Sequence, residues 1–141
     1  MKGREFKDAM YHGLAKLLKA LSNPFRLEII EMLSQGEKSV EGIVQTTSLT
    51  FANASQHLQV LKSSNIVKSR KEKQYVYYSL NNDEFLSLYQ HVMKYAVQEI
   101  AELEKTLNRH REDNKALNAV SLDELETMLQ NENVLLLDVR P

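Results

Sequence analysis

The chain contains no cysteine, and this absence excludes several kinds of chemistry. Without a thiol, disulfides, thiolate zinc sites and cysteine catalysis are impossible within these 141 residues. No apolar run approaches the roughly 20 residues that a membrane-spanning helix needs. The N-terminus also lacks the pattern of a signal peptide. We therefore expect a cytoplasmic protein with no membrane partner.

Net charge is nearly absent as well, at −1, but this value conceals an asymmetry. Residues 1–81 hold 12 Lys and Arg against 7 Asp and Glu, whereas residues 82–141 hold 6 against 12. A basic front half suggests contact with a polyanion. The length and the 43% hydrophobic content suit one globular domain plus an appendage.

The stretch 50–63 has no acidic residue, yet its periodicity predicts an amphipathic helix with Thr50 as the N-cap. Its apolar stripe, at spacings of three and four, consists of Phe51, Ala54, Leu58 and Leu61. The opposite side carries Asn53, Gln56, Gln59 and Lys62, with Ser55 beside them. Amides and hydroxyls both donate and accept hydrogen bonds, as base readers in the major groove must. A plain solvent-exposed polar face is the alternative interpretation.

Three further helices are predicted before this stretch, over residues 5–21, 24–33 and 39–45. Pro24 suits a first helical position, and Gly36 can take the left-handed conformation that ends a helix. The third and fourth helices are short and joined by a turn of a few residues. This arrangement is the helix-turn-helix pattern.

After Asn65 the pattern changes to strands over residues 66–70 and 74–80, joined by a turn over 71–73. A hairpin directly after a recognition helix is a wing. Its basic residues, against a single acid at Glu72, are Lys68, Arg70, Lys71 and Lys73. They predict phosphate contact, and a solubilising hairpin turn is the alternative.

A long helix is predicted from residue 83 to about residue 110. Its apolar residues alternate spacings of three and four, like a coiled-coil seam: Leu86, Tyr89, Met93, Ala96, Ile100, Leu103 and Leu107. Such a helix, roughly 35–40 Å long, outreaches the winged core. Its partner is therefore either the same helix of a second copy, the chain's own first helix, or both. The predicted dimer interface comprises Leu14, Leu17, Leu86, Tyr89, Met93, Ala96, Ile100 and Leu103.

Residues 111–120 are polar and predict a linker, whereas residues 121–141 open with a capping box and end in an apolar strand. A lone apolar strand cannot complete a domain. We therefore predict a winged helix-turn-helix and dimerisation domain over 1–110, a linker over 111–120, and the incomplete start of another domain over 121–141.

Residues of about 10–105 resemble the ArsR/SmtB family of winged-helix repressors. The resemblance lies in the segments 18–27, 55–62, 66–67 and 75–80. It implies a mainly α fold with a small β-hairpin, and a homodimer that packs through its first and last helices on a palindromic operator. In this family the helix holding Ser55 and His57 enters the major groove of double-stranded DNA.

The predicted DNA-contacting residues are Thr50, Asn53, Ser55, Gln56, His57, Gln59, Lys62, Arg70, Lys71 and Lys73. We expect Asn53, Ser55 and Gln56 to read bases, and Lys62, Arg70 and Lys73 to hold phosphates. His57 lies at the border of the apolar stripe, so orienting the helix or touching a phosphate is the alternative to a base contact.

The residues that match the family's metal sites do not suit a metal. Ser39 and Glu41 stand where some members carry a cysteine pair on the third helix. Residues 82–98 lack the acid and histidine pattern of another site. His91 and His110 are nineteen residues apart, about 28 Å along a helix. We predict no metal and no cofactor, and a site shared between two copies is the alternative.

The tail from about Leu117 resembles the opening of a rhodanese-like domain, in segments 121–125 and 135–141. Sulfur transfer needs a cysteine thiolate, so we predict that this chain is not an enzyme. The predicted function is a transcriptional repressor that responds to a sulfur, redox or metal signal through a C-terminal domain. The alternatives are the regulatory module of a rhodanese-type sulfurtransferase and a protein-binding adaptor.

Overall fold

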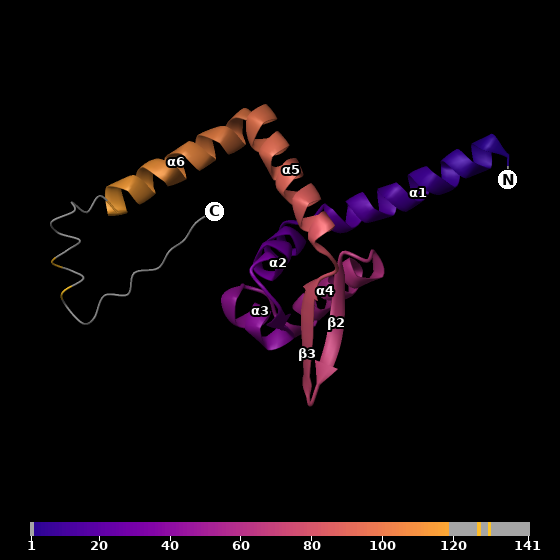
Figure 1. The fold of residues 1–141 in the computed structure, drawn as a ribbon, viewed down its shortest axis with the longest axis horizontal. Coiled ribbons are helices and arrows are strands. Elements are labelled where there is room, and N and C mark those ends of the chain that lie inside the picture. The colour runs from indigo at the N-terminus through magenta and orange to yellow at the C-terminus, as the bar shows by residue number, and fades with distance from the viewer. Residues whose placement is uncertain (1, 119–126, 128–129, 131–141) are drawn as a thin grey trace. The chain divides into compact units, whose positions relative to one another are not determined.

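α1 (Gly3–Leu21) opens the computed structural model, which describes residues 2–118, 127 and 130 (Figure 1). The elements that follow are α2 (Pro24–Ser34), β1 (Lys38–Ser39), α3 (Val40–Thr46), α4 (Phe51–Ser63), β2 (Val67–Glu72), β3 (Tyr75–Leu80), α5 (Asp83–Glu99) and α6 (Ala101–Asn118). The predicted fold, mainly α with a small antiparallel hairpin, is confirmed. The chain divides into two compact units, Met1–Val92 and Met93–Pro141.

Four helices begin where a side chain accepts a hydrogen bond from an otherwise unpaired first-turn amide. These caps are Asn23 before α2, Ser39 before α3, Thr50 before α4 and Asn82 before α5. After α2 the chain turns at Gly36, whose φ of +139° is a value that residues with a side chain rarely adopt. These signals are local, which is why the predicted helix limits in the first unit hold to within a few residues.

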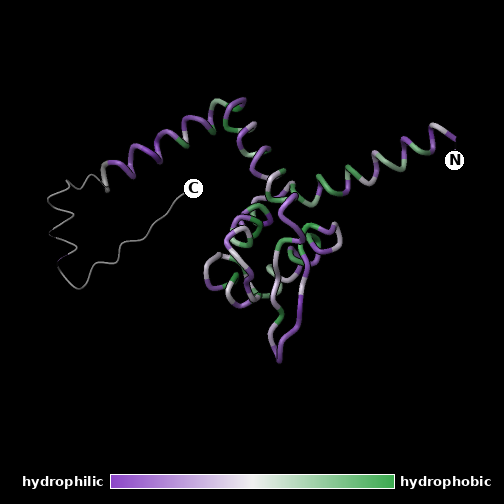
Figure 2. Tube along the Cα trace, in the orientation of Figure 1, coloured by the Kyte–Doolittle hydropathy of each residue, from purple (hydrophilic) through white to green (hydrophobic). Residues whose placement is uncertain are grey.

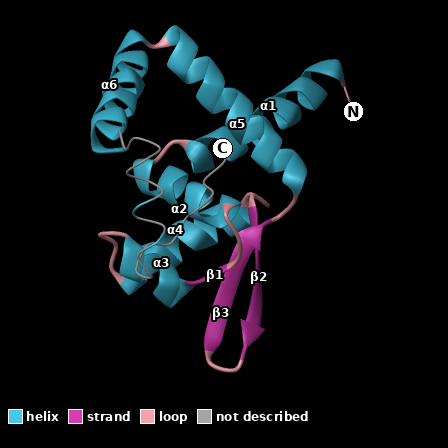
Figure 3. Cartoon of the chain, turned by 60° about the vertical axis from the view of Figure 1, so that its left-hand side comes forward, coloured by secondary structure: helices cyan, strands magenta, loops and turns pink. Residues whose placement is uncertain are grey.

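The sheet has the antiparallel order β1-β3-β2, with the hairpin projecting beyond the helices (Figure 3). The sequence predicted β2 and β3 but not β1. Ser39 of this two-residue strand pairs with Tyr77 of β3, which in turn pairs with Arg70 of β2. Two residues are too few to show any periodicity, so β1 carries no sequence signal.

The core of the first unit lies between α2, α3, α4 and the inner face of the sheet. Its buried residues are Ala20, Ile29, Ile30, Leu33, Val40, Ile43, Leu49, Ala54, Leu58, Leu61, Ile66, Val67 and Tyr78. Phe85 and Tyr89 of α5 pack against this cluster. The predicted stripe of α4 is therefore confirmed at three of its four positions, and Phe51 is the exception.

The helix predicted from 83 to about 110 is interrupted, so that prediction was wrong. α5 ends at Glu99, and the carbonyl of Ile100 accepts hydrogen bonds from the amides of Leu103 at 3.0 Å and Glu104 at 3.2 Å. No proline or glycine lies between 83 and 118. The apolar periodicity continues on both sides of the break, so it cannot distinguish one helix from two.

Residues 111–118, predicted as a linker, are helical and belong to α6. Arg, Glu, Lys, Ala and Leu favour helix even without an apolar stripe, which explains the difference. The domain boundaries themselves stay a prediction. The short helix expected from residue 121 and the strand expected at 134–137 lie outside the described residues.

Candidate nucleic-acid interface

The first turn of α4 is held by an N-cap hydrogen bond and by a pair of buried apolar residues, and the polar side of the helix is left outward. The hydroxyl of Thr50 accepts a hydrogen bond from the amide of Asn53 at 3.2 Å. Leu49, directly before the cap, is buried together with Ala54, four residues inside the helix. This pair has the arrangement of a hydrophobic staple, which sets the angle at which the chain enters a helix.

Phe51 was predicted to face the core, and the structure contradicts this. The ring is 54% exposed. Leu49 and Ala54, on either side of it in the chain, are buried, so the core includes both neighbours while Phe51 stays exposed in the first turn. Only tertiary packing decides which of two apolar residues flanking a cap is buried, and periodicity placed Phe51 wrongly.

The outward side of α4 carries the predicted base readers. Asn53 and Gln56 are exposed, and Ser55 is half-buried. No acid lies in the first turn, or anywhere in α4, so no acidic side chain of this helix offsets the partial positive charge at its N-terminus. The structure thus places these amide and hydroxyl groups on one acid-free surface.

His57 is half-buried and bonded to the junction of α1 and α2. Its Nδ1 accepts a hydrogen bond from Nη1 of Arg26 at 3.3 Å, and its ring centroid lies 5.9 Å from that of Phe25. Burial, and then the charge of Arg26, hold the pKa of His57 below its usual value of 6.5. This geometry fits the orienting role that the sequence left open for His57.

Two further residues that were predicted to contact DNA connect α4 to the hairpin. Lys62 donates to the hydroxyl of Ser69 in β2 at 2.8 Å. Gln59 donates to the hydroxyl of Tyr78 in β3 at 3.4 Å. Both side chains therefore brace the wing against the helix, in addition to any contact they make with a ligand.

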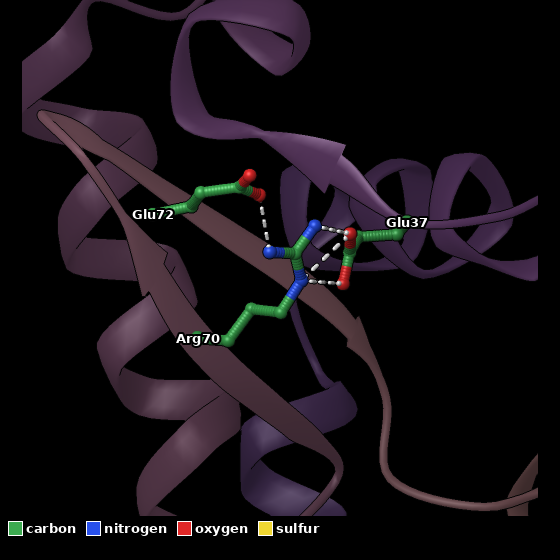
Figure 4. A network of polar contacts seen from close by, with 3 residues as sticks. All are labelled: Glu37, Arg70 and Glu72. Atoms are coloured by element: carbon green, nitrogen blue, oxygen red, sulfur yellow. Dashed lines mark hydrogen bonds and ion pairs between the residues drawn. The ribbon is translucent and has the colours of Figure 1, made fainter.

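Arg70, predicted to hold a phosphate, is engaged within the chain (Figure 4). Its guanidinium donates to Glu37 at 2.6, 2.9 and 3.0 Å and to Glu72 at 2.6 Å. Hydrogen bonds to Glu37 and then Glu72 raise the pKa of Arg70, and the bond to Arg70 lowers the pKa of Glu37 below 4.5. The sequence could not show this contact because Glu37 precedes Arg70 by 33 residues.

The two faces of the hairpin have different environments. Tyr78 is buried on the inner face, where α4 packs, and its cross-strand partner is Ser69. Arg70 and Tyr77 pair on the opposite, outer face. Lys71 alternates with Arg70 and thus lies on the side of α4, and Lys73 follows at the turn with φ of +56°. Within residues 2–118, neither lysine forms an ion pair, so both are available to an anion.

The predicted dimer residues of the first unit fall into two groups. Leu14 is 52% exposed, whereas Leu17 and Tyr89 pack against the chain's own core. Leu86 is half-buried, and the apolar residues that α5 exposes in this unit are Leu88 and Val92, at 50% and 52%. In this unit Leu88 and Val92 are therefore more exposed than the predicted Leu86 and Tyr89. Figure 2 shows apolar residues recurring along α1.

In the second unit, Met93, Ile100 and Leu103 are exposed, at 44%, 49% and 41%, and Ala96 is half-buried. Within the described residues, no three histidine, aspartate or glutamate side chains come close enough to hold a metal ion. The described helices also include none that is long and apolar enough to cross a membrane.

A helix-turn-helix followed by a hairpin, with an acid-free outer helix face, defines a winged helix-turn-helix protein. The sequence profile described as "Bacterial regulatory protein, arsR family" matches residues 23–69. The transcriptional repressor SdpR of Bacillus subtilis is 31% identical over 65 residues, which are 46% of this chain and 72% of SdpR. The chain therefore belongs to the ArsR family, whose members regulate transcription and are not enzymes.

A second relative is the HTH-type transcriptional regulator Rv0324 of Mycobacterium tuberculosis, 35% identical over 97 residues. The aligned stretch is 69% of this chain and spans only 43% of Rv0324. Among solved structures, the homodimeric winged helix-turn-helix DNA-binding domain (fragment 1–100) of Mb0332 from Mycobacterium bovis has a TM-score of 0.65 and 34% identity. The structural alignment covers 71% of this chain and 91% of the fragment.

Proposed function

We propose that the chain is a homodimeric repressor that binds a palindromic operator. The observation that carries this proposal is the acid-free outer side of α4, in the same unit as a hairpin whose Lys71 and Lys73 form no ion pair within residues 2–118. Amide and hydroxyl groups that both donate and accept suit base edges, and unpaired ammonium groups suit phosphates.

The residues have different roles in this proposal. Asn53, Ser55 and Gln56 read bases in the major groove, and Lys71 and Lys73 hold the phosphates beside it. The hydroxyl of Thr50 caps α4, and His57 orients it. Gln59 and Lys62 contribute contacts from positions braced by the hairpin. Arg70 contributes least, because Glu37 and Glu72 already neutralise it.

Dimerisation is supported by the apolar side chains that α1 exposes. Phe6, Met10, Tyr11, Leu14 and Leu18 are each more than half exposed. A contiguous apolar stripe of this kind usually marks an interaction surface. The structurally similar Mb0332 fragment is described as homodimeric. In such a dimer the two α4 helices enter successive major grooves, about 34 Å apart.

The signal is proposed to act through a rhodanese-like domain that begins near residue 121. Support comes from the motif resemblance and from Rv0324, more than half of which lies outside the aligned stretch. Sensing sulfur, redox state or a metal by a thiol would require cysteines that these 141 residues lack. The chain, which has no cysteine, should therefore show no thiosulfate sulfurtransferase activity. Turnover would contradict the prediction that this chain is not an enzyme.

The proposal is tested by selecting duplexes from a random-sequence pool with the purified chain. We then compare a selected duplex with random DNA in gel shifts at several salt concentrations. We expect affinity for the selected duplex to be on the order of 10³-fold higher, with steep salt dependence for both. A protein-binding adaptor would select no sequence, and that result would overturn the proposal.

A further inference from the structure

Phe51 is a large apolar side chain left exposed at the first position of α4. Its ring is 54% exposed, although three later apolar residues of the same helix are fully buried. Ala52 and Asn53 beside it are also exposed. The staple formed by Leu49 and Ala54 closes the core without it. Packing within the described part of the chain therefore gives no reason for an aromatic side chain at this position.

The contact between α1 and α4 lies at the other end of α4. Gly13, Lys16 and Leu17 of α1 line a small cavity with Ser63, Ser64 and Asn65, at the C-terminus of α4. Phe51 is twelve residues away from Ser63, about 18 Å along the helix axis. These α1 residues, which neighbour the exposed Leu14, therefore lie at the end of α4 opposite to Phe51.

The surroundings of Phe51 fit a nucleic acid. α4 has no acid, and its N-terminus carries the partial positive charge of the helix dipole. Asn53 and Gln56, proposed to read bases, extend from the same end of the helix. The apolar group that the major groove offers beside its donors and acceptors is the 5-methyl group of thymine.

We propose that Phe51 packs against the 5-methyl group of a thymine and is a sequence-determining residue of the operator contact. This inference rests on the proposed function, because it requires α4 to lie in the major groove. This contact adds a preference for thymine, because it depends on apolar packing against the methyl group. Amide and hydroxyl groups, which recognise bases through hydrogen bonds, supply this preference less well.

The test uses a duplex selected by the wild-type chain, in which each thymine of one half-site is replaced in turn by deoxyuridine. Uracil lacks only the methyl group, so every hydrogen-bonding group is kept. We expect one replacement to weaken wild-type binding roughly fourfold, as burial of one methyl-sized group predicts. The same replacement should have no effect on Phe51→Ala.

Val60→Ala is the matched control, because Val60 is an exposed apolar residue of α4, 39% exposed, in its second half. We expect this variant to keep the wild-type response to uracil. Phe51→Leu should retain part of the response, and both Phe51 variants should bind random DNA like the wild type.

The inference is overturned if no thymine of the selected duplex responds to uracil, or if Phe51→Ala responds as the wild type does. Either result leaves the proposed function intact, since the selected duplex would still be bound. If the wild-type chain selects no duplex at all, the proposed function fails and this inference fails with it.

Discussion

The guanidinium carbon of Arg70 lies 4.6 Å from the ring centroid of Tyr77, its cross-strand neighbour in β3. From there the guanidinium reaches Glu37, just before β1, and thus crosses the middle strand of the sheet. A cation over an aromatic face that also forms an ion pair is held in one orientation. Arg70 therefore holds the hairpin to the edge strand.

The first prediction compares two cations of the wing. The plot of log affinity against log salt concentration has a negative slope. Lys73→Ala should make this slope shallower by about 0.9, the value for one lost phosphate contact. Arg70→Ala should lower it by less than half as much, because the acids neutralise Arg70 in the free protein. Gel shifts on random DNA at four salt concentrations measure both slopes. Equal losses would show that DNA displaces Glu37 from Arg70.

The second prediction concerns Glu37→Gln, which removes the main partner of Arg70. We expect tighter binding to random DNA and a steeper salt slope, since a cation is released. The bond to Arg70 lowers the pKa of Glu37 below 4.5, so Glu37 stays ionised at neutral pH and loses its charge only on strong acidification. The effect should therefore be the same at pH 6 and pH 8.

Glu28→Gln is the control for that change. Glu28 is an exposed acid of α2 that forms no ion pair within the described residues, so its replacement removes the same charge without releasing Arg70. An equal gain in affinity in this control would mean that total charge, rather than release of Arg70, is responsible.

The third prediction concerns the surface between copies. Leu88→Glu should weaken self-association roughly tenfold or more. The reason is that a leucine exposed in one copy, and expected to be buried between two copies, is replaced by a charged side chain. Gln90→Glu, an exposed polar position two residues along α5, should have little effect. Sedimentation equilibrium measures both. If the two variants associate equally well, Leu88 does not belong to the interface.

The fourth prediction follows from the lowered pKa of His57, caused by burial and by Arg26. Because the folded state favours the neutral imidazole, its contribution to stability is present above pH 6.5 and is lost as pH falls through the folded-state pKa. The melting temperature of the wild type should thus fall more steeply between pH 7.5 and pH 5 than that of His57→Gln. Parallel profiles would contradict the prediction, and His12→Gln, an exposed histidine of α1, is the control.

The fifth prediction separates base reading from phosphate contact. Gln56→Ala should weaken binding to a selected duplex by 1–3 kcal/mol, the approximate value of a good bidentate base contact, while leaving affinity for random DNA unchanged. A fresh selection with the variant should show relaxed preference at one position per half-site. Equal losses on both DNAs would assign Gln56 to the backbone.

The parts of the fold that the sequence predicts well are those with local causes. Thr50, Ser39 and Asn82 cap helices because a hydroxyl or amide oxygen reaches an amide three residues further along the chain. The stripe of Ala54, Leu58 and Leu61 follows from the helical repeat alone.

The parts that the sequence misses depend on contacts between distant segments. The pairing of Arg70 with Glu37 joins residues 33 positions apart, and the two residues of β1 pair with β3, about 40 positions later in the chain. Phe51 is exposed whereas Leu49, just before the cap, is buried, and periodicity within α4 cannot anticipate a choice made by packing outside the helix. The interruption at Ile100 has no counterpart in the local sequence.

Arg26 has a mechanical consequence for any signal that reaches α1. Its planar guanidinium donates to the carbonyl oxygens of Ala20 at 2.5 Å and Lys19 at 3.2 Å, where α1 ends, and to His57 in the middle of α4. A rotation of α1 therefore either moves α4 as well or breaks at least one of these hydrogen bonds. Through Arg26, the position of the end of α1 is thus coupled to that of the middle of α4.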